Sequence, residues 1–172
     1  MTKNKMLLAL LAVVFLALPQ SLCAQFNWKY TVEKGKIVTE VPKRAPGQTT
    51  ALELRTPKMP VVRVGFVGLG MRGPGAVARW MHIPGIEVVA LCDYEAKRAE
   101  ACQKILRDNS MPAAAIYSGE EGYKELCKRK DIDLVYIATD WDHHFLVAKC
   151  AMENGKHAAI EVPSAINLRE IW

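Results

Sequence analysis

The chain has 172 residues, of which 51% are hydrophobic and 24% charged, and its formal net charge is +5. This length and apolar content are enough for one ordinary hydrophobic core. The basic residues are scattered among acidic ones and are not interleaved with aromatic side chains, so the charge argues against a nucleic-acid-binding face.

The first 24 residues have the pattern of an export signal. Two lysines precede an unbroken apolar run, residues 6–18, which Pro19 ends. Because this run is shorter than the roughly 20 residues that span a bilayer, a cleaved signal is favoured over a retained anchor. We expect the cut after Ala24, no stable membrane insertion afterwards, and a mature protein that is periplasmic or secreted.

The cysteines limit two further possibilities. A lipoprotein would use Cys23, but the bulky Leu22 precedes it, where lipoprotein signals generally have a small residue. The four cysteines beyond the signal form no CxxC or paired spacing, so the sequence predicts no metal site. Each lies in an apolar or helical context, which favours small buried side chains. Export would permit a disulfide, but the sequence does not pair them.

Residues 25–60 are predicted to be an extended arm or linker. Four prolines and two glycines stand among Lys, Thr and Gln, without a sustained hydrophobic period.

From residue 61 to residue 172 strand patterns alternate with helix patterns. We expect strands over residues 61–67, 86–93, 114–118, 132–139 and 156–162, and helices over 75–82, 95–106, 120–129 and 144–155. Such alternation is typical of βαβ units and predicts an α/β fold, a Rossmann-type doubly wound parallel sheet. Ser118, with Glu121 three residues later, is expected to cap the third helix. Because the chain ends at Trp172 inside a helix expected from Asn167, we expect this domain to be truncated before a second, α+β domain.

A glycine-rich turn follows the first expected strand. Gly68, Gly70 and Gly73 have the G-x-G-x-x-G spacing of a dinucleotide-binding turn, which opens a helix whose N-terminal amides favour phosphate. Asp93 ends the second strand, where a carboxylate accepts hydrogen bonds from ribose hydroxyls and repels a 2′-phosphate. NAD is therefore favoured over NADP, although Arg72 could also meet a phosphate. A glycine turn with a structural aspartate is the alternative.

Three more polar or aromatic residues follow strand ends. Ligands of open parallel sheets bind beyond the carboxyl ends of the strands, where Trp141, His144 and Glu161 are expected. Alternatively, His143 and His144 begin a helix and bind nothing. Adjacent residues at a helix start point in different directions, which also argues against a metal site.

Two segments, YIATDWDHH and GKHAAIEVPSA, resemble the signature segments T-P-N-x-x-H and E-K-P of the Gfo/Idh/MocA oxidoreductases. Thr139 and His144 match the first segment, and Glu161 and Pro163 match the second. Val162 stands where the dehydrogenases carry a catalytic lysine, and a hydrocarbon cannot relay a proton.

In these departures the chain resembles glycosyl hydrolase family 109, the NAD-dependent, exported α-N-acetylgalactosaminidase-like branch. Members of that branch have a Trp-containing, His-ending turn in the first segment and E-V-P in the second. The resemblance implies that Met71 and Arg72 line the cofactor phosphates and that Asp93 holds the ribose. It assigns the nicotinamide side to residues after the last two strands: Thr139, Trp141, Asp142, His143, His144, Glu161 and Val162.

The resemblance also implies a reaction. Such glycosidases withdraw hydride from a sugar hydroxyl onto NAD, eliminate the aglycone, add water and return the hydride, so NAD needs only to be retained. The expected partner is a small carbohydrate, and a homo-oligomer is left open. The catalytic residues are expected beyond residue 172, so this chain alone is expected to be inactive. The alternatives are a sugar or polyol NAD-dependent oxidoreductase and a non-catalytic nucleotide-binding fragment.

Overall fold

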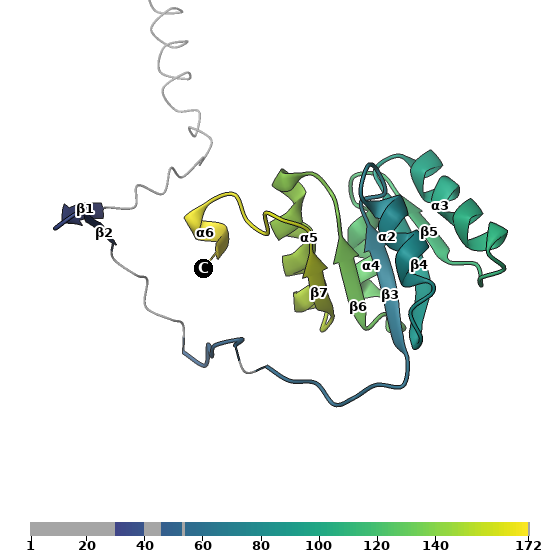
Figure 1. Cartoon of the computed structure of the whole chain (residues 1–172), viewed down its shortest axis with the longest axis horizontal. Coiled ribbons are helices and arrows are strands. Elements are labelled where there is room, and N and C mark those ends of the chain that lie inside the picture. Colours follow the sequence, from purple (N-terminus) through teal and green to yellow (C-terminus); the bar gives the residue numbers. More distant parts are fainter. Residues whose placement is uncertain (1–29, 40–45, 53, 172) are drawn as a thin grey trace, which may run out of the picture. The chain divides into compact units, whose positions relative to one another are not determined.

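The computed structural model describes residues 30–39, 46–52 and 54–171 (Figure 1). The expected signal, residues 1–24, and its cut lie outside the described residues. The chain divides into two units, one up to Leu54 and one from Arg55 onwards. Within the part that the structure describes, no helix is both long enough and apolar enough to cross a membrane.

The first unit contains a small hairpin. Strand β1 (Tyr30–Glu33) pairs antiparallel with β2 (Lys36–Thr39). Lys34 and Gly35 have φ of 49° and 76°, and positive φ at both central residues is what the tightest hairpin turns require. The side chains of residues 31–38 are exposed, so the hairpin builds no core. The sequence predicted only an extended arm here, because the two strands are short and have no buried face that would give them a hydrophobic period.

The second unit is built on a five-stranded parallel sheet. Its strands are β3 (Val62–Val67), β4 (Ile86–Asp93), β5 (Ala115–Ser118), β6 (Leu134–Ile137) and β7 (His157–Ile160). Their order across the sheet is β5-β4-β3-β6-β7, and every neighbouring pair is parallel. Numbered within the sheet this is 3-2-1-4-5, the doubly wound order. The predicted fold class is confirmed.

Helices cover the sheet in two layers. The helices of this unit are α2 (Gly73–Trp80), α3 (Ala96–Asp108), α4 (Gly122–Lys128), α5 (Trp141–Glu153) and the short α6 (Leu168–Ile171). Helices α2 and α3 contribute to one hydrophobic cluster, and α4 and α5 to a second. In β3, Phe66 belongs to the first cluster and Val67 to the second, so the strand separates the two layers.

The pairing of β3 with β4 contains a register shift. Val64 pairs with Val88, but the next residue, Gly65, pairs with Ala90, so Val89 is an extra residue in β4. Both Val89 and Ala90 pack in the second cluster, as expected at a β-bulge, where the side-chain alternation is interrupted once.

Helix α4 begins differently from the prediction. Its N-cap is Glu121, which makes no side-chain cap hydrogen bond, whereas Ser118 ends β5. Gly119, with φ of +83°, turns the chain between them and donates its N–H to the carbonyl of Tyr94. The prediction that Ser118 caps this helix is therefore wrong, because a turn intervenes.

All four cysteines of this unit are free thiols. Cys92, Cys102 and Cys127 are buried, as the apolar context predicted, and Cys150 is half-buried. Burial raises the pKa of Cys92 and of Cys127 to about 12, so both thiols stay protonated near neutral pH.

Candidate dinucleotide site

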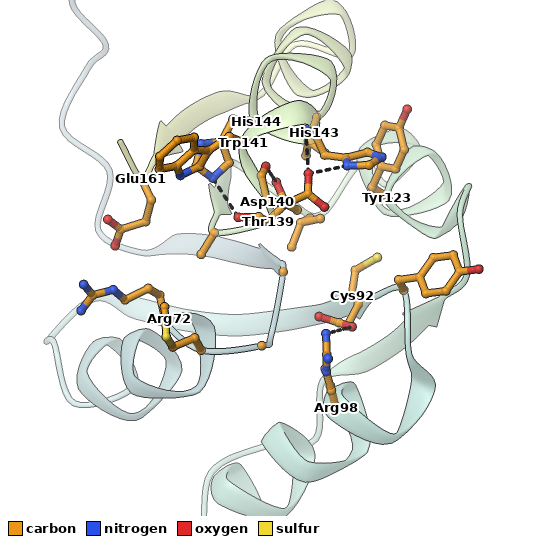
Figure 2. A pocket seen from close by; sticks show the side chains of 18 of the residues that line it. Arg72, Cys92, Arg98, Tyr123, Thr139, Asp140, Trp141, His143, His144 and Glu161 are labelled. Atoms are coloured by element: carbon orange, nitrogen blue, oxygen red, sulfur yellow. Dashed lines mark hydrogen bonds and ion pairs between the residues drawn. The ribbon is translucent and has the colours of Figure 1, made fainter. Parts of the chain in front are cut away.

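A cavity of about 770 Å³ lies at the carboxyl ends of β3, β4, β6 and β7 (Figure 2). It brings together eleven of the residues predicted from the sequence: Gly68, Gly70, Met71, Arg72, Asp93, Thr139, Trp141, His143, His144, Glu161 and Val162. Two predicted residues do not line it. Gly73 is buried at the start of α2, and Asp142 is exposed in the first turn of α5.

The three glycines of the turn have different surroundings. Gly68 has φ of +89°, and a Cβ there would lie 2.4 Å from the backbone nitrogen of Thr139. A Cβ at Gly73 would lie 2.1 Å from the carbonyl oxygen of Gly68. Gly70 is exposed, and a Cβ there would meet only Arg98, at 3.6 Å. The fold therefore requires the first and third glycines, and the second leaves the backbone open to a ligand.

Asp93 fixes the glycine turn to the end of β4. Its side chain is only 5% exposed, and its two oxygens accept hydrogen bonds from the backbone N–H of Leu69 (2.6 Å) and of Glu95 (2.9 Å). The Arg98 guanidinium is 3.5 Å from the same carboxylate and 2.8 Å from that of Glu95. These contacts hold the glycine turn and the start of α3 against the end of β4.

The turn after β6 is closed by Asp140. The Asp140 carboxylate accepts hydrogen bonds from the backbone N–H of His143 (3.1 Å) and contacts the His143 ring nitrogen Nδ1 (2.6 Å). Burial, the largest single effect, raises the pKa of Asp140, but the hydrogen bonds and charge of His143 outweigh it and leave the pKa below its usual range. Capping at Asp140 starts α5 at Trp141, three residues before the predicted helix.

His144 joins two loops at the rim of the cavity. Its side chain is 1% exposed, with Nδ1 2.6 Å from the carbonyl oxygen of Pro163 and Nε2 3.1 Å from that of Thr139. One loop follows β7 and the other follows β6. Both ring nitrogens are therefore occupied by protein, so His144 shapes the site and does not present a free nitrogen to a ligand.

A hydrogen bond from a buried tyrosine positions the carboxylate of Glu161. The Tyr136 hydroxyl donates a hydrogen bond to its carboxylate, and the Tyr136 ring packs on Phe66 and Trp80 with centroids 5.3 and 4.9 Å apart. Burial, followed by the hydrogen bond to Glu161, raises the pKa of Tyr136 to about 12. Beside Glu161, the Val162 side chain is 83% exposed.

Further residues line the cavity without having been predicted: Val67, Cys92, Tyr94, Arg98, Gly119, Glu120, Tyr123, Ala138, Asp140 and Val147. Most come from the ends of β4 and β6 and the starts of α3, α4 and α5. Of these, only Arg98 could have been predicted from the sequence, because it lies in the first turn of the helix that follows Asp93. The others depend on how the loops fold back, which no spacing in the sequence shows.

The fold, the glycine turn and the carboxylate after the second strand define a Rossmann-type dinucleotide-binding domain. Residues 62–171 match the family model described as "Oxidoreductase family, NAD-binding Rossmann fold". The chain belongs to this family, the Gfo/Idh/MocA oxidoreductases.

The chain is also similar to particular members. It is 66% identical over 160 residues to Glycosyl hydrolase family 109 protein 5 of Phocaeicola vulgatus, covering 91% of this chain and 31% of that protein. Protein 4 of the same organism is 68% identical over 148 residues, covering 86% and 28%. Among solved structures, the myo-inositol dehydrogenase of Lactobacillus casei, in complex with NAD(H) and myo-inositol, matches with a TM-score of 0.56 and 30% identity, covering 64% and 31%. The chain thus spans about a third of the length of the curated relatives it matches.

Proposed function

We propose that this chain is the NAD-binding part of an exported, NAD-dependent glycosidase of the glycosyl hydrolase family 109 type, acting on α-N-acetylgalactosaminides or related glycosides. The observation that carries the proposal is Val162. It lies at the cavity rim beside Glu161, and its exposed hydrocarbon side chain stands where the dehydrogenases of the family have a lysine. The similarity to family 109 proteins supports the same conclusion.

The cavity suits NAD. The exposed Gly70 and the start of α2 offer open backbone to a pyrophosphate, and the Arg72 side chain lies at the same edge. Asp93 faces the cavity with its negative charge, which suits a ribose with free hydroxyls. When bound, NAD would supply a hydride acceptor that returns the hydride within one catalytic cycle.

On the side of the cavity formed by the loops after β6 and β7, residues of this chain hold the site residues in position. Tyr136 holds the Glu161 carboxylate, and His144 ties the loop that carries Val162 to the loop after β6. Because Val162 cannot exchange a proton, another residue must perform proton transfer to the sugar. We place that residue in a stretch that the relatives contain beyond the part they share with this chain.

A sugar or polyol oxidoreductase is the second candidate, favoured by the similarity to myo-inositol dehydrogenase. The two functions differ in the fate of the hydride. An oxidoreductase releases free NADH with each turnover, whereas the glycosidase cycle regenerates NAD.

A chimera tests the proposal. The aligned stretch of Glycosyl hydrolase family 109 protein 5 is replaced by the corresponding residues of this chain, and a chromogenic α-N-acetylgalactosaminide is offered in deuterated water. We expect cleavage without accumulation of NADH, and deuterium in the released sugar at the carbon next to the transient carbonyl. A chimera carrying Gly70→Ala, in which backbone approach to the cofactor is blocked, is the matched control.

Two outcomes would contradict the proposal. Cleavage without deuterium uptake would exclude the hydride mechanism, and steady NADH production from a free sugar would favour the oxidoreductase. The unmodified 172-residue chain is expected to bind NAD and to cleave nothing.

A further inference from the structure

Four charged side chains gather where β4 passes into α3. The Glu95 carboxylate is 2.7 Å from the Lys97 ammonium and 2.8 Å from the Arg98 guanidinium. Arg98 is also 3.5 Å from Asp93. The formal charges of these two carboxylates and two cations cancel, so the cluster as a whole adds no net positive charge beside the cavity.

Arg98 is nevertheless placed where a phosphate could reach it. It lines the cavity together with Asp93 and Tyr94, its side chain is 45% exposed, and it is the group nearest to a Cβ built on Gly70. In Figure 2 it rises from α3 towards the acidic end of β4. Guanidinium groups bind phosphates through two parallel hydrogen bonds, and in Rossmann domains that use NADP an arginine near the end of the second strand accommodates the 2′-phosphate.

Asp93 is committed to the fold. Both of its oxygens accept backbone hydrogen bonds, from Leu69 and from Glu95, which hold the glycine turn and the start of α3. Its 3.5 Å approach to Arg98 is longer than an ordinary charged hydrogen bond. The contact that restrains Arg98 is therefore the one with Glu95.

We propose that Glu95 is a specificity-determining residue, which holds the Arg98 guanidinium neutralised and so makes the cavity accept NAD and reject NADP. The proposal rests on the NAD binding proposed above. A 2′-phosphate entering this end would meet the Asp93 carboxylate and an arginine that is already paired with Glu95. Removal of the Glu95 charge leaves Arg98 with only its longer contact to Asp93, free to turn to the phosphate.

The test compares NAD and NADP binding to the whole 172-residue chain by calorimetry at one fixed ionic strength. Glu95→Gln keeps the shape of the side chain, and because Glu95 makes no side-chain cap hydrogen bond to α3, the helix start is preserved. We expect this variant to bind NADP at least about 10-fold more tightly than the unmodified chain, with NAD affinity within about 3-fold.

Two matched variants separate the role of Arg98 from that of net charge. Glu100→Gln makes the same charge change at an exposed position of α3 and should leave both affinities unchanged. Arg98→Gln, added to Glu95→Gln, should abolish the gain in NADP affinity.

The proposal is overturned if the unmodified chain binds NADP as tightly as NAD, if Glu95→Gln leaves NADP binding unchanged, or if the gain survives the loss of Arg98. These results leave the proposed NAD binding intact. If the folded chain and all its variants bind neither dinucleotide, the proposed function fails and this proposal fails with it.

Discussion

Gly68 and Gly70 stand two residues apart, yet the fold depends on only one of them. We expect Gly68→Ala to destabilise the protein by at least about 2 kcal/mol, because its Cβ would lie 2.4 Å from a backbone nitrogen at a φ of +89°. We expect Gly70→Ala to leave the free energy of unfolding within about 0.5 kcal/mol of the original, but to weaken NAD binding at least about 10-fold. Urea unfolding and calorimetry measure the two effects.

Gly155 provides a control for this comparison. Its φ is +73°, but a Cβ there would meet nothing within 4 Å. Gly155→Ala therefore reports the backbone cost alone, about 1 kcal/mol. If Gly68→Ala costs no more than Gly155→Ala, or if Gly70→Ala binds NAD normally, the division of roles between the two glycines is contradicted.

At the scale of single residues, motif spacing predicts where a residue lies in the fold better than it predicts the hydrogen-bond partners of that residue. The spacing of the glycines and Asp93 anticipated that they would meet at one end of the sheet, and most of the predicted residues line one cavity. Their roles in cofactor binding remain predictions. The backbone partners of Asp93 could not be predicted, because they depend on how two loops curve after their strands. Asp142 is exposed in the first turn of α5, which begins at Trp141, and it does not line the cavity.

Between elements, the His144 side chain links the loop after β7 to the loop after β6 at the rim of the cavity. His144→Ala would remove a fully buried ring and leave the carbonyls of Thr139 and Pro163 without it. We expect a loss of about 2–4 kcal/mol in the free energy of unfolding. We also expect faster hydrogen exchange in residues 161–166, because the loop after β7 loses its link to α5. Urea unfolding and exchange mass spectrometry measure these effects.

His82 offers a matched control. It is exposed in the turn after α2, so His82→Ala should change the free energy of unfolding by less than about 0.5 kcal/mol. Unchanged exchange in residues 161–166 of His144→Ala would show that the loop holds its place without the His144 side chain.

The elements themselves follow from the sequence where burial dominates. Strand β4 has the predicted bounds, and all five strands of the sheet lie within or at the edges of the predicted ranges, because continuous apolar runs are typical of strands covered on both faces. Helix starts were less predictable. Asp140 begins α5 early, and the turn at Gly119 displaces the start of α4, since capping depends on local hydrogen bonds that compete within a few residues. The hairpin β1–β2 was missed because its strands are short and exposed.

For the whole molecule, the prediction of export rests on residues 1–24, which lie outside the described fold. We propose that residues 1–24 are removed in the cell, which would lower the formal charge from +5 to +3 by the loss of two lysines. Intact-mass measurement of the exported protein should therefore show Gln25 as the first residue. A mature species that keeps the apolar run 6–18, or one diacylated at Cys23, would contradict this expectation.

The extra residue in β4 has a consequence for the direction of Asp93. Side chains alternate along a strand, so two residues three apart normally point to opposite faces. Val88 and Leu91 nevertheless share the cluster of α2 and α3, because Val89 resets the alternation between them. Asp93, two residues beyond Leu91, therefore lies on the same face of the sheet, where its carboxylate accepts a hydrogen bond from the N–H of Leu69. One residue fewer in β4 would turn the carboxylate towards α4. The extra residue Val89, four positions before Asp93, thus decides on which side of the sheet the negative charge of the site lies.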